Sequence, residues 1–90
     1  MAGVVKMDTG LGFQTADKFN QEAENIQGLL NGLNAQMDGL NGTWEGTSRT
    51  RFESEYTSVK NDMTRFIQML RDVSQRIRTE TQQIVDADTA

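Results

Sequence analysis

The chain has 90 residues, a formal net charge of −4 at pH 7, and neither histidine nor cysteine. These counts fit one small domain, remove the imidazole base, the thiol nucleophile and the usual zinc ligands, and exclude a disulfide framework. We therefore expect a protein that is not an enzyme and binds no cofactor or metal. The chain also lacks proline and the alternating β-branched pattern of strands, which predicts an all-α fold.

The N-terminal segment, residues 1–13, contains only the short apolar pair Val4-Val5. This pair is too short for the core of a signal peptide, and no apolar run in the chain is long enough to span a membrane. We expect neither a cleaved leader nor stable membrane insertion. Asp8 or Thr9 is the expected cap of the first helix.

A first long helix is predicted from about residue 11 to residue 40. Its apolar residues are separated by alternating steps of three and four, the pattern of a buried helical seam. They are Ala16, Phe19, Ala23, Ile26, Leu30, Leu33, Met37 and Leu40. Asn31-Gly32 resembles a turn, but the apolar phase continues through it, which favours one uninterrupted helix.

A second stripe on this helix consists of small residues, which lie roughly opposite the apolar seam. They are Gly28, Gly32, Ala35 and Gly39. A glycine in a helix interior costs about 1 kcal/mol relative to alanine, so the stripe predicts a compensating close approach of another helix at a dimer interface. The alternative is that these residues are merely tolerated on a solvated face.

The centre of the chain breaks the helical pattern between residues 41 and 46. Gly42 and Gly46 favour a turn, and Thr43 is expected to cap the following helix. Trp44, the only tryptophan, is either an aromatic side chain folded back onto the helix ends or, in addition, part of a docking surface.

A second helix is predicted from about residue 47 to residue 81, followed by a flexible tail at residues 82–90. Its seam consists of Phe52, Tyr56, Val59, Met63, Phe66, Leu70, Val73 and Ile77, widened by Ile67 and Met69. The tail is expected because the seam weakens at Glu80 and resumes only at Ile84. Two long amphipathic helices joined by a tight turn predict an antiparallel hairpin in a single domain.

The charges of the two predicted helices have opposite signs. Residues 14–40 contain one basic and four acidic residues, a balance of −3, whereas residues 49–78 contain seven basic and four acidic residues, a balance of +3. This complementarity favours the antiparallel pairing more than it adds stability, because exposed ion pairs contribute about 0–1 kcal/mol each.

A short helical hairpin with Trp44-Glu45-Gly46 at its turn resembles the WXG family, the early-secreted-antigen-like substrates of type VII secretion in Gram-positive bacteria and mycobacteria. The resemblance covers residues 5–85. It implies a hairpin that pairs with itself or with a similar WXG hairpin as a four-helix bundle dimer. It also implies a dimer that forms in the cytoplasm and is secreted folded, without a cleaved signal peptide, through a membrane ATPase, sometimes beside a larger effector.

The chain departs from the family pattern after the second helix, where relatives often carry Tyr-x-x-x-Asp/Glu as part of the export signal. The only tyrosine, Tyr56, lies inside the predicted helix and is followed at that spacing by Lys60. The nearest substitute is formed by Ile84, Val85 and Asp88, which would share one face of a helical turn. A partner or effector could supply the rest of the signal.

Other functional classes fit less well. A cytosolic coiled-coil adaptor that is not exported would share the seams and charges, but it gives no reason for Trp-x-Gly at the turn. A helix-turn-helix protein would need a short recognition helix and a basic face, so we expect no nucleic-acid partner. A carboxylate-bridged metal enzyme would need inward-facing acids, which the predicted seams lack before Glu80.

Overall fold

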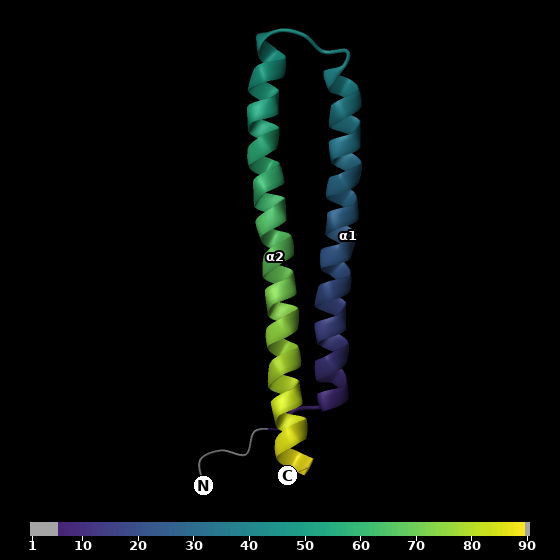
Figure 1. The fold of residues 1–90 in the computed structure, drawn as a ribbon, viewed down its shortest axis with the longest axis vertical. Helices are drawn as coiled ribbons and strands as arrows, with labels where there is room; N and C mark the ends of the chain where they lie inside the picture. The colour runs from purple at the N-terminus through teal and green to yellow at the C-terminus, as the bar shows by residue number, and fades with distance from the viewer. Residues whose placement is uncertain (1–5, 90) are drawn as a thin grey trace.

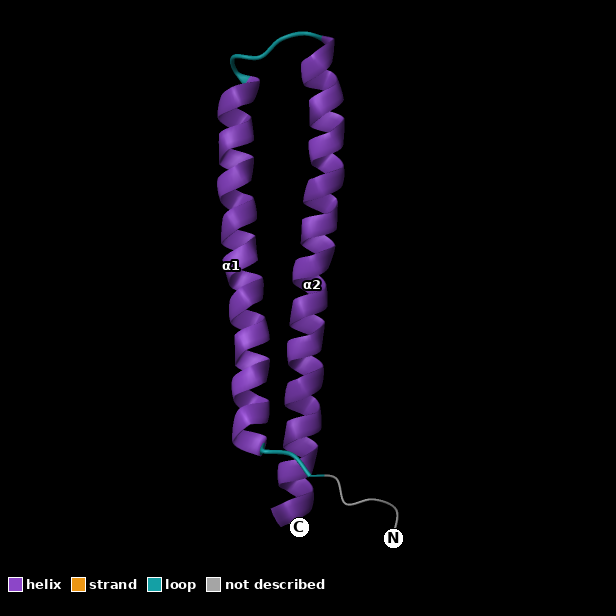
Figure 2. Cartoon of the chain, turned by 180° about the vertical axis from the view of Figure 1, so that it is seen from behind, coloured by secondary structure: helices purple, strands orange, loops and turns teal. Residues whose placement is uncertain are grey.

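The computed structural model describes residues 6–89 and contains two long helices joined by a short connection (Figure 1). Helix α1 spans Thr9–Asn41 and α2 spans Thr47–Thr89. The helices run antiparallel as a hairpin that measures 68 × 22 × 14 Å, with no strand in the described part (Figure 2). The prediction of an all-α antiparallel hairpin is therefore confirmed.

Helix α1 begins at a conventional cap. The Asp8 carboxylate accepts a hydrogen bond of 3.0 Å from the backbone N–H of Leu11, and this satisfies one of the free donors of the first turn. The helix continues through Asn31-Gly32 without interruption, as the apolar phase predicts. The expected cap at Asp8 is thus correct, although the helix starts at Thr9 rather than near residue 11.

The core between the helices is small. Its buried centre consists of Ala23, Leu30 and Ile67, with Ile26, Met63 and Leu70 packed around them. Towards the open end, Ser74 donates a buried hydrogen bond of 2.6 Å to the backbone carbonyl of Ala16. Small and hydroxyl side chains therefore let the two backbones approach closely between the apolar centre and the open end of the hairpin.

Ion pairs connect the acidic α1 to the basic α2. Arg71 lies 3.0 Å from the Glu24 carboxylate, and Arg78 pairs with Asp17 about two turns nearer the open end. Both pairs are exposed to solvent, so they support the antiparallel arrangement while each contributes about 0–1 kcal/mol.

Helix α2 does not end near residue 81, as predicted, but continues to Thr89. The segment from Thr47 onward contains neither glycine nor proline, so nothing in its local sequence stops the helix. Ile84 and Val85 are also half-buried, and Gln82 donates a hydrogen bond of 2.9 Å to the Asp86 carboxylate one turn later. The predicted flexible tail at residues 82–90 is therefore helical as far as Thr89, and residue 90 lies outside the described residues.

Candidate functional site

The connection at the closed end of the hairpin is built to end one helix and start the next. Gly42 keeps a right-handed conformation, with φ −70° and ψ −15°. Both the backbone N–H and the hydroxyl of Thr43 donate to the Leu40 carbonyl, each at 2.9 Å. Thr43 thus satisfies a free carbonyl at the end of α1, and the prediction that it caps the following helix is wrong.

Gly46 starts α2 from a conformation that other residues rarely adopt. Its φ is +110°, and its carbonyl accepts a bond of 3.4 Å from the N–H of Thr50. A side chain at this position would be strained although space is available around it, so the turn requires glycine. This backbone requirement explains the glycine of the Trp-x-Gly pattern in this chain.

Trp44 packs onto the first turns of α2. Its indole N–H donates to the Ser48 hydroxyl at 3.2 Å, and its ring centre lies 5.4 Å from that of Phe52 at an interplanar angle of 43°. The indole is half-buried and Glu45 beside it is exposed. The ring therefore fixes the turn on α2 and still presents part of its surface at the tip.

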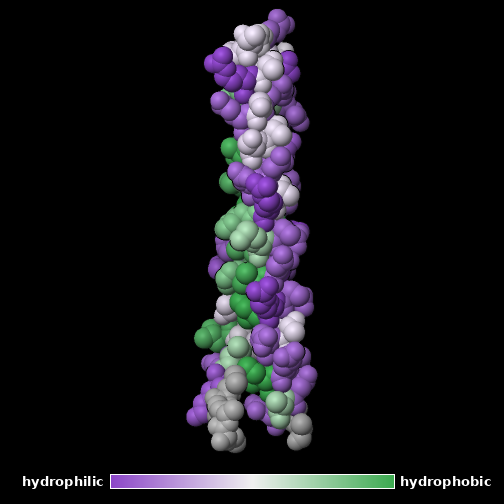
Figure 3. All heavy atoms as spheres, turned by 90° about the vertical axis from the view of Figure 1, so that its left-hand side faces the viewer, coloured by the Kyte–Doolittle hydropathy of each residue, from purple (hydrophilic) through white to green (hydrophobic). Residues whose placement is uncertain are grey.

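Five large apolar side chains form a second feature, which we call the apolar stripe. It consists of Leu33, Leu40, Phe52, Val59 and Phe66, whose exposed fractions run from 40% to 51%. Within each helix the members are seven residues apart, so they lie on one face of a two-stranded coil. In the space-filling view, apolar side chains gather in the middle and lower parts of the visible face beside a hydrophilic column, and the upper end is neutral or hydrophilic (Figure 3).

The apolar stripe corrects the predicted seam. Phe52, Val59 and Phe66 belong to the predicted seam but stay exposed, whereas Met63 and Leu70 of the same seam pack against the core. Between them α2 turns a neighbouring row of residues inward. That row includes Ile67 and the hydroxyl residues Ser74 and Thr81, all three of them buried. Ile67 was part of the predicted seam, but Ser74 and Thr81 were overlooked because they are polar. Small side chains at these positions permit a closer approach of the helices than phenylalanine would.

The predicted small-residue stripe lies on the surface of α1. Its members Gly28, Gly32, Ala35 and Gly39 are all exposed. A Cβ atom added at any of the three glycines would meet nothing within 4 Å, so packing inside the hairpin does not require glycine there. Their assignment to a dimer interface stays a prediction.

The three residues of the predicted export segment lie on the last turns of α2. Ile84 and Val85 are half-buried, whereas Asp88 is exposed. The helical conformation brings Ile84 and Asp88 to neighbouring positions one turn apart. This end of α2 extends beyond the start of α1 (Figure 1).

Residues 6–89 contain no group of three or more carboxylates that could hold a metal ion. Within the same range, neither helix combines the length and the apolar character that crossing a bilayer requires. The candidate site consists of three surfaces: the Trp-Glu-Gly turn, the apolar stripe and the last turns of α2.

Together the fold and the turn define a class, the antiparallel helical hairpin with a Trp-x-Gly connection. The model of the WXG100 family, described as proteins of 100 residues with WXG, matches residues 5–89. The chain belongs to this family, and the predicted resemblance is confirmed. No curated protein sequence matched the chain.

Solved structures of similar shape include a secreted protein of Bacillus anthracis and a protein of Geobacillus thermodenitrificans. ESXB from Bacillus anthracis, described as a secreted protein, superimposes with a TM-score of 0.85 at 22% identity, covering 96% of this chain and 98% of that one. EsxA from Geobacillus thermodenitrificans gives a TM-score of 0.82 at 26% identity, covering 99% and 96%. These matches support the hairpin fold along nearly the whole chain.

Proposed function

We propose that the protein is a small, non-enzymatic substrate of a type VII secretion system that is exported as a folded pair of hairpins. The observation that carries this proposal is family membership over residues 5–89 together with a Trp-Glu-Gly turn at the tip of the hairpin. The secreted description of the similar Bacillus anthracis protein gives further support.

The apolar stripe supports the pairing of two hairpins. A monomer would leave all five members of the apolar stripe in water, and burial of apolar surface contributes about 25 cal/mol per Å². A second copy, or a similar WXG hairpin, would cover the stripe and complete a four-helix bundle. In this bundle the small residues Gly28, Gly32, Ala35 and Gly39 would let α1 approach a helix of the partner.

We assign recognition by the export machinery to the two ends of the hairpin. The exposed part of Trp44 lies at the closed end, and Ile84, Val85 and Asp88 lie on the protruding end of α2. The proposed readers are a type VII secretion ATPase and, where one exists, a larger effector that the hairpin accompanies as partner or chaperone. The dimer would form in the cytoplasm and leave the cell without a cleaved signal peptide.

The alternative is a cytosolic coiled-coil adaptor, which the apolar stripe would serve equally well. Secretion separates the two functions. In a bacterium with an active type VII ATPase, we expect the protein in the culture medium with its N-terminal residues uncleaved, as read by intact-mass spectrometry. Deletion of the ATPase should leave it inside the cell.

The control for this experiment is a cytosolic marker protein measured in the same medium, which reports lysis. Retention of the protein inside cells whose ATPase exports its other substrates would reject export and favour the adaptor. Release that continues unchanged without the ATPase would reject the type VII route.

A further inference from the structure

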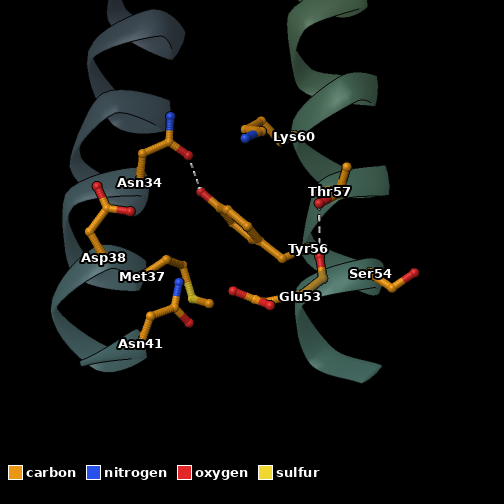
Figure 4. Close-up of a pocket in the computed structure, with 9 residues that line it drawn as sticks. All are labelled: Asn34, Met37, Asp38, Asn41, Glu53, Ser54, Tyr56, Thr57 and Lys60. Carbon is orange, nitrogen blue, oxygen red and sulfur yellow. Dashed lines mark hydrogen bonds between the residues drawn. The ribbon is translucent and has the colours of Figure 1, made fainter. Parts of the chain in front are cut away.

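A polar groove lies between the two helices in the half of the hairpin near the turn (Figure 4). Its volume is about 460 Å³, and it is lined by Asn34, Met37, Asp38 and Asn41 of α1 and by Glu53, Ser54, Tyr56, Thr57 and Lys60 of α2. Neither the pairing of hairpins nor the export segment uses this groove.

Tyr56 crosses the groove and divides it. Its hydroxyl donates to the Asn34 side-chain oxygen at 2.5 Å. Lys60 lies on the same side of the ring as Asn34, whereas Met37, Asn41 and Glu53 project into the space on the other side (Figure 4). The second compartment therefore combines one face of an aromatic ring with oxygen atoms from both helices.

Several of these oxygen atoms have unused capacity to accept hydrogen bonds. The side-chain oxygen of Asn41 is buried and has no hydrogen-bond partner. Within the described residues, Asp38 makes no ion pair, while Glu53 shares its carboxylate with Arg49 at 3.3 Å. A buried acceptor without a donor costs about 1–3 kcal/mol, so a ligand that supplies donors would gain from entering the groove.

The groove opens on the flank opposite the apolar stripe. Successive residues of a helix differ by about 100°, so Leu33 and Leu40 lie on one side of Met37, and Asn34 and Asn41 lie on the other side. A partner hairpin seated on the stripe would therefore leave the groove accessible.

We propose that this groove receives an arginine side chain from a further protein that docks on the outer face of the hairpin near its tip. A guanidinium is planar, carries five N–H donors and stacks on aromatic rings, which matches the Asn41 oxygen, the Asp38 carboxylate and the face of Tyr56. Lys60 repels a cation from the other compartment and so restricts the side of entry. The inference goes beyond the proposed function, and it does not depend on export.

The test is an NMR titration of the folded protein with N-acetyl-arginine N-methylamide. We expect saturable shifts of the side-chain signals of Asn34, Asn41 and Tyr56, with a dissociation constant of order 1 mM, as suits a single side chain. The matched probe is N-acetyl-citrulline N-methylamide, which has nearly the same shape without the charge and should bind at least about threefold more weakly.

Two variants should act in opposite directions. D38N should weaken binding of the arginine probe about threefold, and K60Q should strengthen it about twofold, since each removes one charge from the edge of the groove. E45Q removes an equal charge from the exposed turn and should leave binding unchanged. Circular dichroism checks that each variant keeps the helical fold.

Three results would overturn the proposal. The first is that the citrulline probe binds as tightly as the arginine probe. The second is that the shifts do not saturate and are spread over all acidic residues, and the third is that D38N and E45Q weaken binding of the arginine probe equally. The last two would show general attraction to an acidic protein.

Discussion

At the scale of single residues, Gly12 shows most directly why this chain folds with its helices so close. A Cβ atom at Gly12 would lie 2.5 Å from the Thr81 hydroxyl oxygen and 2.9 Å from the Met7 sulfur. Thr81 is fully buried and donates to the Ile77 carbonyl at 2.7 Å, so its side chain cannot easily turn away. Only glycine fits this contact without displacing α2.

Gly12→Ala should therefore lower the free energy of unfolding by about 1–3 kcal/mol, because an added methyl group in a packed contact forces the helices apart. The measurement is urea unfolding followed by circular dichroism at fixed protein concentration. The matched control is Gly28→Ala, where the added methyl group has open space and a better helix former should raise stability by up to about 1 kcal/mol. Equal effects of the two substitutions would contradict the close contact.

Sequence reasoning located some of these residues and overlooked others, for physical reasons. It placed the turn at residues 41–46 because glycines and a single tryptophan interrupt two apolar seams there. It did not identify Gly12 or Thr81, because a close approach of backbones uses small and polar side chains and leaves no hydrophobic signal. Thr43 was misassigned because a hydroxyl near a turn can serve either helix end.

At the scale of elements, the periodicity of apolar residues predicted both helices. It was less informative about which residues of α2 face α1. The steps of three and four are compatible with two adjacent seams on α2, and the sequence alone favours the more apolar one. The structure turns Ile67, Ser74 and Thr81 inward and leaves Phe66 outside. The predicted seam of α2 therefore combined residues of the core, such as Met63 and Leu70, with residues that remain exposed on a single hairpin.

The end of α2 leads to a prediction about secretion. Deleting residues 82–90 should abolish secretion, because the deletion removes Ile84, Val85 and Asp88 from the proposed export segment. The thermal midpoint should fall by no more than about 5 °C, since only two half-buried apolar side chains are lost.

Secretion is measured in culture medium and the midpoint by circular dichroism. Asp88→Ala tests the exposed carboxylate alone, and Gln82→Ala with Gln83→Ala alters the same segment outside the proposed contacts. Export of the truncated chain at the wild-type level would place the signal in a partner.

At the scale of the whole molecule, the hairpin leaves several large apolar side chains in contact with solvent. Its centre is narrow, with four buried apolar side chains among the described residues, while Phe52, Val59 and Phe66 stay about half exposed. Small chains bury a limited fraction of their surface, and association is one way to bury more. The sequence could not distinguish the inner seam from the apolar stripe, because the residues of both follow the same spacing along the helices.

The most direct test of pairing is sedimentation equilibrium of the wild-type chain beside the Phe66→Asp variant. We expect wild type at about twice the chain mass of 10.1 kDa. Phe66→Asp should raise the dimer dissociation constant by at least about tenfold. Burial of the exposed half of Phe66 contributes about 1 kcal/mol, and the substitution also places an unpaired carboxylate in the interface. Asn61→Asp adds the same charge at an exposed position off the stripe and should leave the dimer intact.

Gly32→Leu, measured in the same way, reports on the small-residue stripe and should also weaken the dimer if α1 approaches a partner helix there. The decisive comparison is between Phe66→Asp and Asn61→Asp. A monomeric Phe66→Asp chain beside a dimeric Asn61→Asp chain is the predicted result. A wild-type chain that sediments at 10.1 kDa at high concentration, or a Phe66→Asp chain that pairs as tightly as wild type, would contradict pairing through the apolar stripe.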